Sequence, residues 1–182
     1  MEKKDVCMLP GTIQCVKNYG YDGLDIWMDD RIENIYEAKF FIGHSLGASF
    51  ILKSNASCDS KFIFVNPLVK KRRRFFHFVN WIRFLVFEGF AIKKAVPVRC
   101  WRHVFRQASA LLGVDVLERM KRIPKENIII IRGRYDDYFC DKESAGILKA
   151  GKFELIEVEA GHDWNENVAK AIADIIGNRQ LP

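Results

Sequence analysis

The sequence lacks a cysteine framework. Its 182 residues include five cysteines, an odd number, and none of them forms a C-x-x-C pair. This usage argues against a disulfide-stapled secreted domain and against a C-x-x-C metal or redox site. We expect reduced thiols in a cytoplasmic protein, at Cys7, Cys15, Cys58, Cys100 and Cys140.

The sequence also lacks a long uninterrupted apolar run. The opening Met-Glu-Lys-Lys-Asp precedes only a short apolar stretch before Pro10, which is typical of a strand and not of a signal-peptide core. A longer apolar segment at 75–92 is interrupted by His77, Asn80, Arg83 and Glu88, and these polar groups argue against a transmembrane span. We therefore expect neither export nor membrane insertion.

Short apolar runs typical of strands alternate along the chain with segments that have helical spacing of apolar residues. With 182 residues, 49% of them hydrophobic, the chain can bury the core of a single domain. Such alternation predicts right-handed crossovers and a parallel sheet covered by helices. The predicted strands are 5–9, 24–27, 39–42, 61–66, 127–132 and 153–158, and the predicted helices between and after them are 30–36, 46–54, 141–149 and 164–176.

One short motif carries chemistry. Gly43-His44-Ser45-Leu46-Gly47 is a G-x-S-x-G sequence between a predicted strand and a predicted helix. A serine hydroxyl becomes a useful nucleophile when a tight strand-to-helix turn exposes it to a base and to the N-terminus of a helix. Glycines at both ends suit such a turn because side chains there would collide with the strand and the helix. The motif predicts that Ser45 is a nucleophile.

Two more acid-base residues follow late strands. Asp136 comes just after the predicted strand 127–132, in Gly133-Arg134-Tyr135-Asp136, and His162 comes just after 153–158, in Ala160-Gly161-His162. The C-terminal ends of parallel strands meet at one edge of a sheet. Ser45, Asp136 and His162 can therefore converge there although they are far apart in sequence.

This order of motifs resembles the α/β-hydrolase superfamily, over essentially the whole chain from Asp5 to the last helix. The resemblance implies that Ser45 is the nucleophile, Asp136 the acid and His162 the general base. It implies an oxyanion hole formed by the backbone N–H of Leu46 and by an N–H of the loop after an early strand, for which Thr12 is the candidate. Here that loop has Pro10-Gly11 in place of the commoner His-Gly.

The resemblance also sets expectations for the sheet. A full-length superfamily member opens with two further strands, which have no counterpart here. We therefore expect a minimal α/β-hydrolase fold with about six strands, all parallel, flanked by helices and carrying a helical cap insertion. No cofactor or metal is required by this chemistry.

Neighbouring polar residues compete for these roles. Asp137 is an alternative acid in the same loop, although the spacing from Gly133 favours Asp136. Asp163 is expected to cap the helix that starts near Trp164, and the side chain of His44 is expected to point away from the serine and to pack. Metal binding by His77 or His103 is not expected, because neither has an acidic partner at ligand spacing.

A basic segment divides the predicted core. Residues 69–125 contain 15 Lys and Arg against 3 Asp and Glu, whereas the remainder contains 14 against 20. We assign 1–68 and 126–182 to the α/β-hydrolase core and 69–125 to the cap. The cap begins with Lys70-Lys71-Arg72-Arg73-Arg74 and continues into an aromatic helix at 75–92.

Two further helices are predicted in the cap. In the first, Trp101, Phe105, Ala108 and Leu112 share one face and Arg99, Arg102 and Arg106 the other, with Gly113 as a stop. The second starts at Asp115, with Glu118 three residues on, and ends before Pro124.

The cap has two candidate uses. A helical lid with an apolar face would line an acyl pocket and exclude water. A polybasic run before an aromatic helix is also typical of peripheral membrane contact. Nucleic-acid binding is not expected, because no recognised nucleic-acid fold accompanies the charge.

Taken together, the motifs predict a serine esterase that cleaves small-molecule carboxylic esters through an acyl-enzyme. The alternatives are a thioesterase or small peptidase of the same fold, or a catalytically silent scaffold that binds partners or membrane through the basic cap. The sequence does not determine the acyl group, the leaving group or the oligomeric state.

Overall fold

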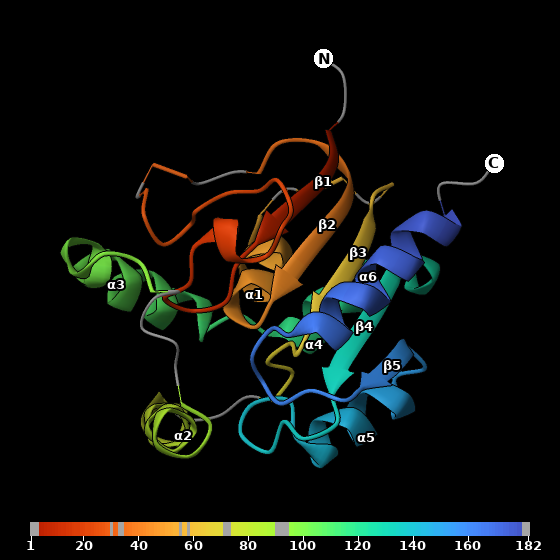
Figure 1. The fold of residues 1–182 in the computed structure, drawn as a ribbon. Helices are drawn as coiled ribbons and strands as arrows, with labels where there is room; N and C mark the ends of the chain where they lie inside the picture. The colour runs from red at the N-terminus through yellow and green to blue at the C-terminus, as the bar shows by residue number, and fades with distance from the viewer. Residues whose placement is uncertain are drawn as a thin grey trace.

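The core of the molecule is a parallel sheet. The computed structural model describes residues 4–29, 31–32, 35–54, 56–57, 59–70, 74–89 and 95–179. Its five-stranded sheet has the order β1-β2-β3-β4-β5, and every neighbouring pair is parallel. All C-terminal strand ends therefore lie at one edge (Figure 1). The strands are β1 Lys4–Leu9, β2 Ala38–His44, β3 Lys61–Val65, β4 Ile128–Gly133 and β5 Glu154–Val158.

Helices cover both faces of the sheet. Because side chains alternate along a strand, each apolar strand buries one set of residues on either face. On one face, Phe41, Phe62 and Ile130 pack in a cluster with residues of α1 Leu46–Lys53, α4 Val116–Met120 and α5 Lys142–Ala150. On the other face, Ile63 and Ile129 pack with the apolar side of α6 Glu166–Arg179. Figure 1 shows α6 in front of the strands and α1 and α4 behind them.

The described residues between β3 and β4 form three α-helices: α2 Arg74–Phe87, α3 Trp101–Leu111 and α4. In Figure 1, α2 lies beyond the C-terminal ends of the strands. Gly89 follows α2 in the left-handed conformation (φ 73°), which suits glycine and ends the helix before the predicted residue 92. Short 3₁₀ turns occupy Val16–Asn18, Val98–Cys100 and Lys125–Asn127.

The predicted fold class is confirmed, with two local corrections. Five of the six predicted strands are present, but 24–27 is not a strand. Its neighbour Gly23 makes an isolated bridge to Met8 at the free edge of β1, and the chain then turns, because the carbonyl of Asp25 accepts from Met28 and Asp29. The predicted helix 30–36 is also wrong, since none of its described residues is helical.

The structure shows which residues of α3 are buried. Trp101 and Phe105 are exposed, whereas Val104 and Leu111 are buried against the core. The helix therefore packs against the core through aliphatic side chains and not through its aromatic ones. The predicted cap of α4 is present, because the side chain of Asp115 accepts from the backbone N–H of Glu118. The predicted run Lys71-Arg72-Arg73 lies outside the described residues.

Candidate active site

Ser45 sits in a strained turn between β2 and α1. Its backbone has φ 53° and ψ −117°, a conformation that costs about 1–3 kcal/mol for a residue with a side chain. The two flanking positions, Gly43 and Gly47, have no room for a side chain. A Cβ atom on Gly43 would lie 2.6 Å from Cα of Ala48, and one on Gly47 would lie 2.2 Å from the carbonyl oxygen of Leu9. The turn is therefore held by its surroundings, as a nucleophile turn requires.

Asp136 is fully buried in the loop after β4. Its carboxylate accepts from the backbone N–H groups of Tyr138, Phe139 and Cys140 at 3.0–3.1 Å. Burial by itself would raise the pKa of Asp136. The charge of His162, the hydrogen bond to its ring and the amides of Phe139 and Cys140 outweigh burial and lower the pKa to about 2. The carboxylate is therefore ionised at neutral pH.

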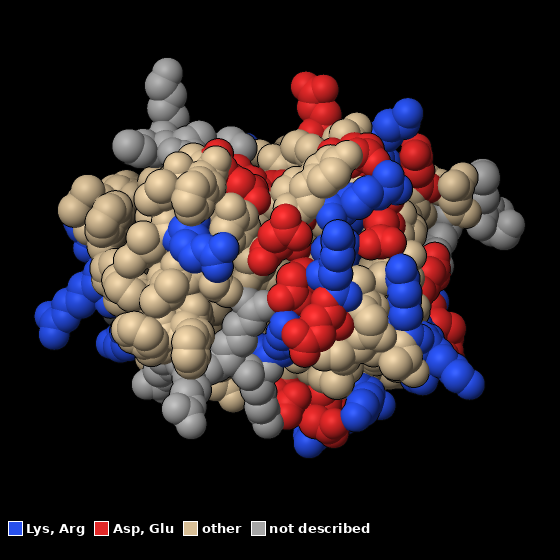
Figure 2. Space-filling model, turned by 90° about the horizontal axis from the view of Figure 1, so that it is seen from below, with Lys and Arg blue, Asp and Glu red and all other residues tan. Residues whose placement is uncertain are grey.

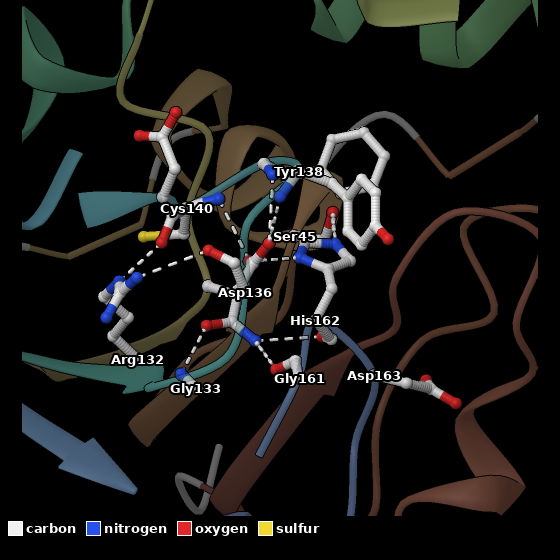
Figure 3. A network of polar contacts seen from close by, with 12 residues as sticks. Ser45, Arg132, Gly133, Asp136, Tyr138, Cys140, Gly161, His162 and Asp163 are labelled. Carbon is white, nitrogen blue, oxygen red and sulfur yellow. Dashed lines mark hydrogen bonds and ion pairs between the residues drawn. The ribbon is translucent and has the colours of Figure 1, made fainter. Parts of the chain in front are cut away.

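The ring of His162 lies between Asp136 and Ser45. Its Nδ1 is 2.6 Å from Oδ2 of Asp136 and its Nε2 is 3.0 Å from Oγ of Ser45 (Figure 3). A carboxylate can only accept, so Nδ1–H donates to Asp136. The lone pair of Nε2 then faces the serine hydroxyl, which is the tautomer that a general base needs. The structure thus brings together the three residues that the sequence grouped.

Asn66, which lies outside these motifs, fixes the backbone of this site. The side chain of Asn66, at the end of β3, donates to the carbonyls of Gly161 and His162 and accepts from the N–H of Gly133. It ties the acid loop to the histidine loop. These loops are in close contact, since a Cβ atom on Gly133 would lie 2.0 Å from the carbonyl oxygen of Gly161. No local motif in the sequence predicts this role for Asn66.

His44 does more than pack. Its Nε2 donates to the carbonyl of His162 at 2.9 Å, and its Nδ1 is 2.8 Å from the hydroxyl of Tyr19. Burial, and then the nearby charge of His162, lower the pKa of His44 to about 4, so the ring is neutral at neutral pH. Both ring nitrogens are therefore engaged in contacts with other residues, and one of them holds the main chain of His162.

The two other acidic residues lie outside the hydrogen-bonded set. Asp137 is exposed next to Asp136. Asp163 points away from the serine and histidine (Figure 3) and accepts instead from the side chain of Gln14 and from the N–H of Trp164. The predicted cap of α6 by Asp163 is wrong. Asn165 provides it, accepting from the N–H of Val168 at 3.0 Å.

Both residues of the expected oxyanion hole adjoin Ser45. Leu46 is the first residue of α1, so its N–H has no acceptor within the helix. Thr12 lines the small cleft of about 30 Å³ over Ser45 and His162. A larger groove, of about 210 Å³, lies between α2 and α3 and begins at Thr12 and Leu46. It is lined mainly by apolar residues, among them Ile13, Trp81, Val104, Ala108 and Leu112.

The remaining histidines make ring and backbone contacts. His77 packs on Phe139 with ring centroids 5.2 Å apart and borders both the cleft and the groove. Nε2 of His103 is 3.0 Å from the carbonyl of Ile26. Within the described part of the chain, no group of three or more His, Cys, Asp or Glu side chains could hold a metal.

Comparison with known proteins adds information about the fold. No family model and no curated protein matches the chain. Among solved structures, it is similar to a carboxylesterase of the ammonia-oxidizing thaumarchaeon Nitrososphaera gargenis, with TM-score 0.53 and 13% identity over 98% of this chain and 90% of that one. It is also similar to the thioesterase domain from the curacin biosynthetic pathway, with TM-score 0.54 and 12% identity over 96% and 91%. The chain therefore adopts the α/β-hydrolase fold.

Proposed function

We propose that the protein is a serine hydrolase that cleaves carboxylic esters through an acyl-enzyme. The observation that supports it most is the continuous hydrogen-bonded line from Asp136 through His162 to Ser45. A buried ionised acid, an oriented imidazole and a strained serine at the edge of a parallel sheet are together suited to acyl transfer.

The geometry suggests the order of proton transfers. Oγ of Ser45 attacks the ester carbonyl while Nε2 of His162 takes its proton, and Asp136 stabilises the imidazolium that forms. The N–H groups of Leu46 and Thr12 stabilise the oxyanion. His162 then donates its proton to the departing alcohol. A water molecule, deprotonated by His162, then attacks the acyl-enzyme, and His162 returns that proton to Oγ of Ser45 as the acid leaves.

The acyl group is proposed to occupy the groove between α2 and α3. The groove begins at the two residues of the oxyanion hole, and its walls are mainly apolar. Its volume of about 210 Å³ compares with the roughly 150 Å³ of a cavity that holds benzene, so it would hold an acyl chain of about eight carbons. The polar side of the cleft, at Gln14 and Asp163, remains for the alcohol.

A thioester would use the same groups, and the curacin thioesterase domain shares the fold. We favour the oxygen ester because Gln14 and Asp163 offer hydrogen-bonding groups on the side where the alcohol would leave. Rates on matched octanoyl esters and thioesters distinguish the two.

A reducing, cytoplasmic location remains part of the proposal. No disulfide joins any two of the cysteines that the structure describes, and three of them, Cys7, Cys15 and Cys140, are buried. No helix among the described residues is long and apolar enough to cross a bilayer. The division into a core, 1–68 with 126–182, and a cap, 69–125, is likewise proposed, with α2 as the part of the cap that lies over the site.

Hydrolysis of p-nitrophenyl esters by wild type and Ser45→Ala tests this function. We expect the substitution to lower kcat by about 10³-fold or more, because the nucleophile is lost. The matched control is Ser49→Ala, one turn further along α1, whose hydroxyl has no hydrogen-bond partner among the described residues. Circular dichroism checks folding. A Ser45→Ala protein with more than about a tenth of wild-type activity would contradict the assignment.

A further inference from the structure

The outward face of α2 is apolar and exposed. Phe75, Val86 and Phe87 are 69–72% exposed, and three more large apolar side chains share this face: Phe76, Phe78 and Ile82. The opposite face of the helix is anchored. Phe84 packs on Phe139 and His162, and the side chain of Asn80 donates to the carbonyl of Tyr138. The helix is therefore held in this orientation by polar and aromatic contacts.

The exposed surface continues onto the neighbouring helix. Trp101 and Phe105 of α3 and Val98 just before it are also exposed. Phe78 and Phe105 line the groove between the two helices, so the apolar surface extends to that groove. We call these nine residues the interfacial surface: Phe75, Phe76, Phe78, Ile82, Val86, Phe87, Val98, Trp101 and Phe105. In Figure 2, one side of the molecule is mainly uncharged, with a few Lys and Arg side chains, whereas Asp, Glu, Lys and Arg mix over the other side.

Charge selects among possible partners of such a surface. The segment 69–125 carries 15 basic against 3 acidic residues. Arg83 lies on α2 between interfacial residues, and Arg99, Arg102 and Arg106 are exposed on and next to α3. A second copy of the chain would place these like charges against one another in a two-fold dimer. An anionic lipid surface instead accepts both the aromatic side chains and the arginines.

We propose that the interfacial surface binds an anionic lipid bilayer. The contact is peripheral, since α2 has 14 residues, a length of about 21 Å, against a hydrocarbon core of about 30 Å. Bound in this way, the protein turns the mouth of the groove towards the lipid. On the proposed function, an acyl chain then passes from the bilayer into the groove and its ester reaches Ser45. Binding itself does not depend on that function.

Vesicle sedimentation with the full-length Ser45→Ala protein tests binding without turnover. We expect it to bind vesicles of phosphatidylcholine and phosphatidylserine at low salt, to bind them less at high salt, and to bind pure phosphatidylcholine at least tenfold more weakly. Replacing Phe75 and Phe87 with serine is expected to weaken binding by tenfold or more. Met28→Ser, at an exposed apolar residue outside the surface, is the matched control.

A second variant removes charge without touching the apolar residues. Replacing Arg102 and Arg106 with glutamine is expected to weaken binding about fivefold per charge, and only to the anionic vesicles. Circular dichroism checks the fold of each variant, and the exposed positions of these side chains favour its retention.

Three results would overturn the inference. The first is that the Ser45→Ala protein does not bind anionic vesicles at low salt. The second is that the Phe75 and Phe87 variant binds as well as Met28→Ser. The third is a dimer in lipid-free sedimentation that the same phenylalanine substitutions dissociate. Ester hydrolysis is measured separately on wild type. Hydrolysis without vesicle binding removes only this inference, and vesicle binding without hydrolysis removes only the proposed function.

Discussion

At the scale of single residues, the site depends on side chains whose partners are main-chain groups. Asn66 and His44 hold the carbonyl of His162 from two sides, at 2.9 Å each. Their contacts cross 96 and 118 positions of the chain, and every residue has a carbonyl, so no sequence pattern marks these partners. Ser45, Asp136 and His162 were predictable because each follows a strand in a distinctive local motif.

The choice between two adjacent aspartates gives a prediction. Asp136→Asn is expected to lower kcat by about 10³- to 10⁴-fold, because an amide cannot stabilise the imidazolium and favours the wrong tautomer of His162. Asp137→Asn is the matched control one position along the chain, and it is expected to remain within a few-fold of wild type because its side chain is exposed. Steady-state kinetics on p-nitrophenyl octanoate measures both.

If Asp137→Asn proved the more damaging change, the acid would have to be moved by one position. If both changes were mild, the acid would lie elsewhere and the hydrogen bond from His162 to Asp136 would be structural.

At the scale of helices and strands, apolar runs predicted the buried elements well. The run Ile128 to Ile131 has no polar residue because β4 is covered on both faces, and the structure places it between β3 and β5. The segment 24–27 is also apolar except for Asp25, but it lies beyond the edge strand β1, and its backbone hydrogen bonds close a local turn. An apolar run shows burial and does not show pairing.

The face of α3 illustrates the same limit. Helical spacing groups Trp101 with Phe105, and it equally groups Val104 with Leu111. Which group is buried depends on α1, against which α3 packs, and the fit there selects the smaller residues. The larger aromatic residues remain outside, and Phe105 lines the groove.

The groove between α2 and α3 leads to a prediction about chain length. For wild type, kcat/KM is expected to rise about fourfold per methylene from acetate to about octanoate and then to level off, because each added methylene is buried until the groove is full. Ala108→Phe fills the groove. It is expected to lower the ratio of octanoate to acetate kcat/KM by about tenfold or more.

Ala110→Phe is the matched control, because residue 110 is exposed on the same helix and does not line the groove. A flat chain-length profile, or equal ratios for the Ala108→Phe and Ala110→Phe proteins, would show that the acyl chain lies elsewhere.

At the scale of the whole molecule, charge is distributed unevenly between the two predicted parts. The segment 69–125 is strongly basic and the remainder is acidic, although the net charge of the whole chain is only +6. The structure places α3 and α4 against α1, so part of this segment completes the core, while α2 crosses the site. Composition could locate the segment but could not show which of its helices pack inward.

Labelling with a fluorophosphonate tests the central claim most directly, that Ser45 is a nucleophile activated by His162 and Asp136. The reagent phosphonylates a serine only when a base and an oxyanion hole activate it. We predict one adduct per chain by intact mass spectrometry, located on Ser45 by peptide mapping, and none in Ser45→Ala. Absence of an adduct on the folded wild-type protein, or an adduct that persists in Ser45→Ala, would contradict the account, and absence would favour a catalytically silent scaffold.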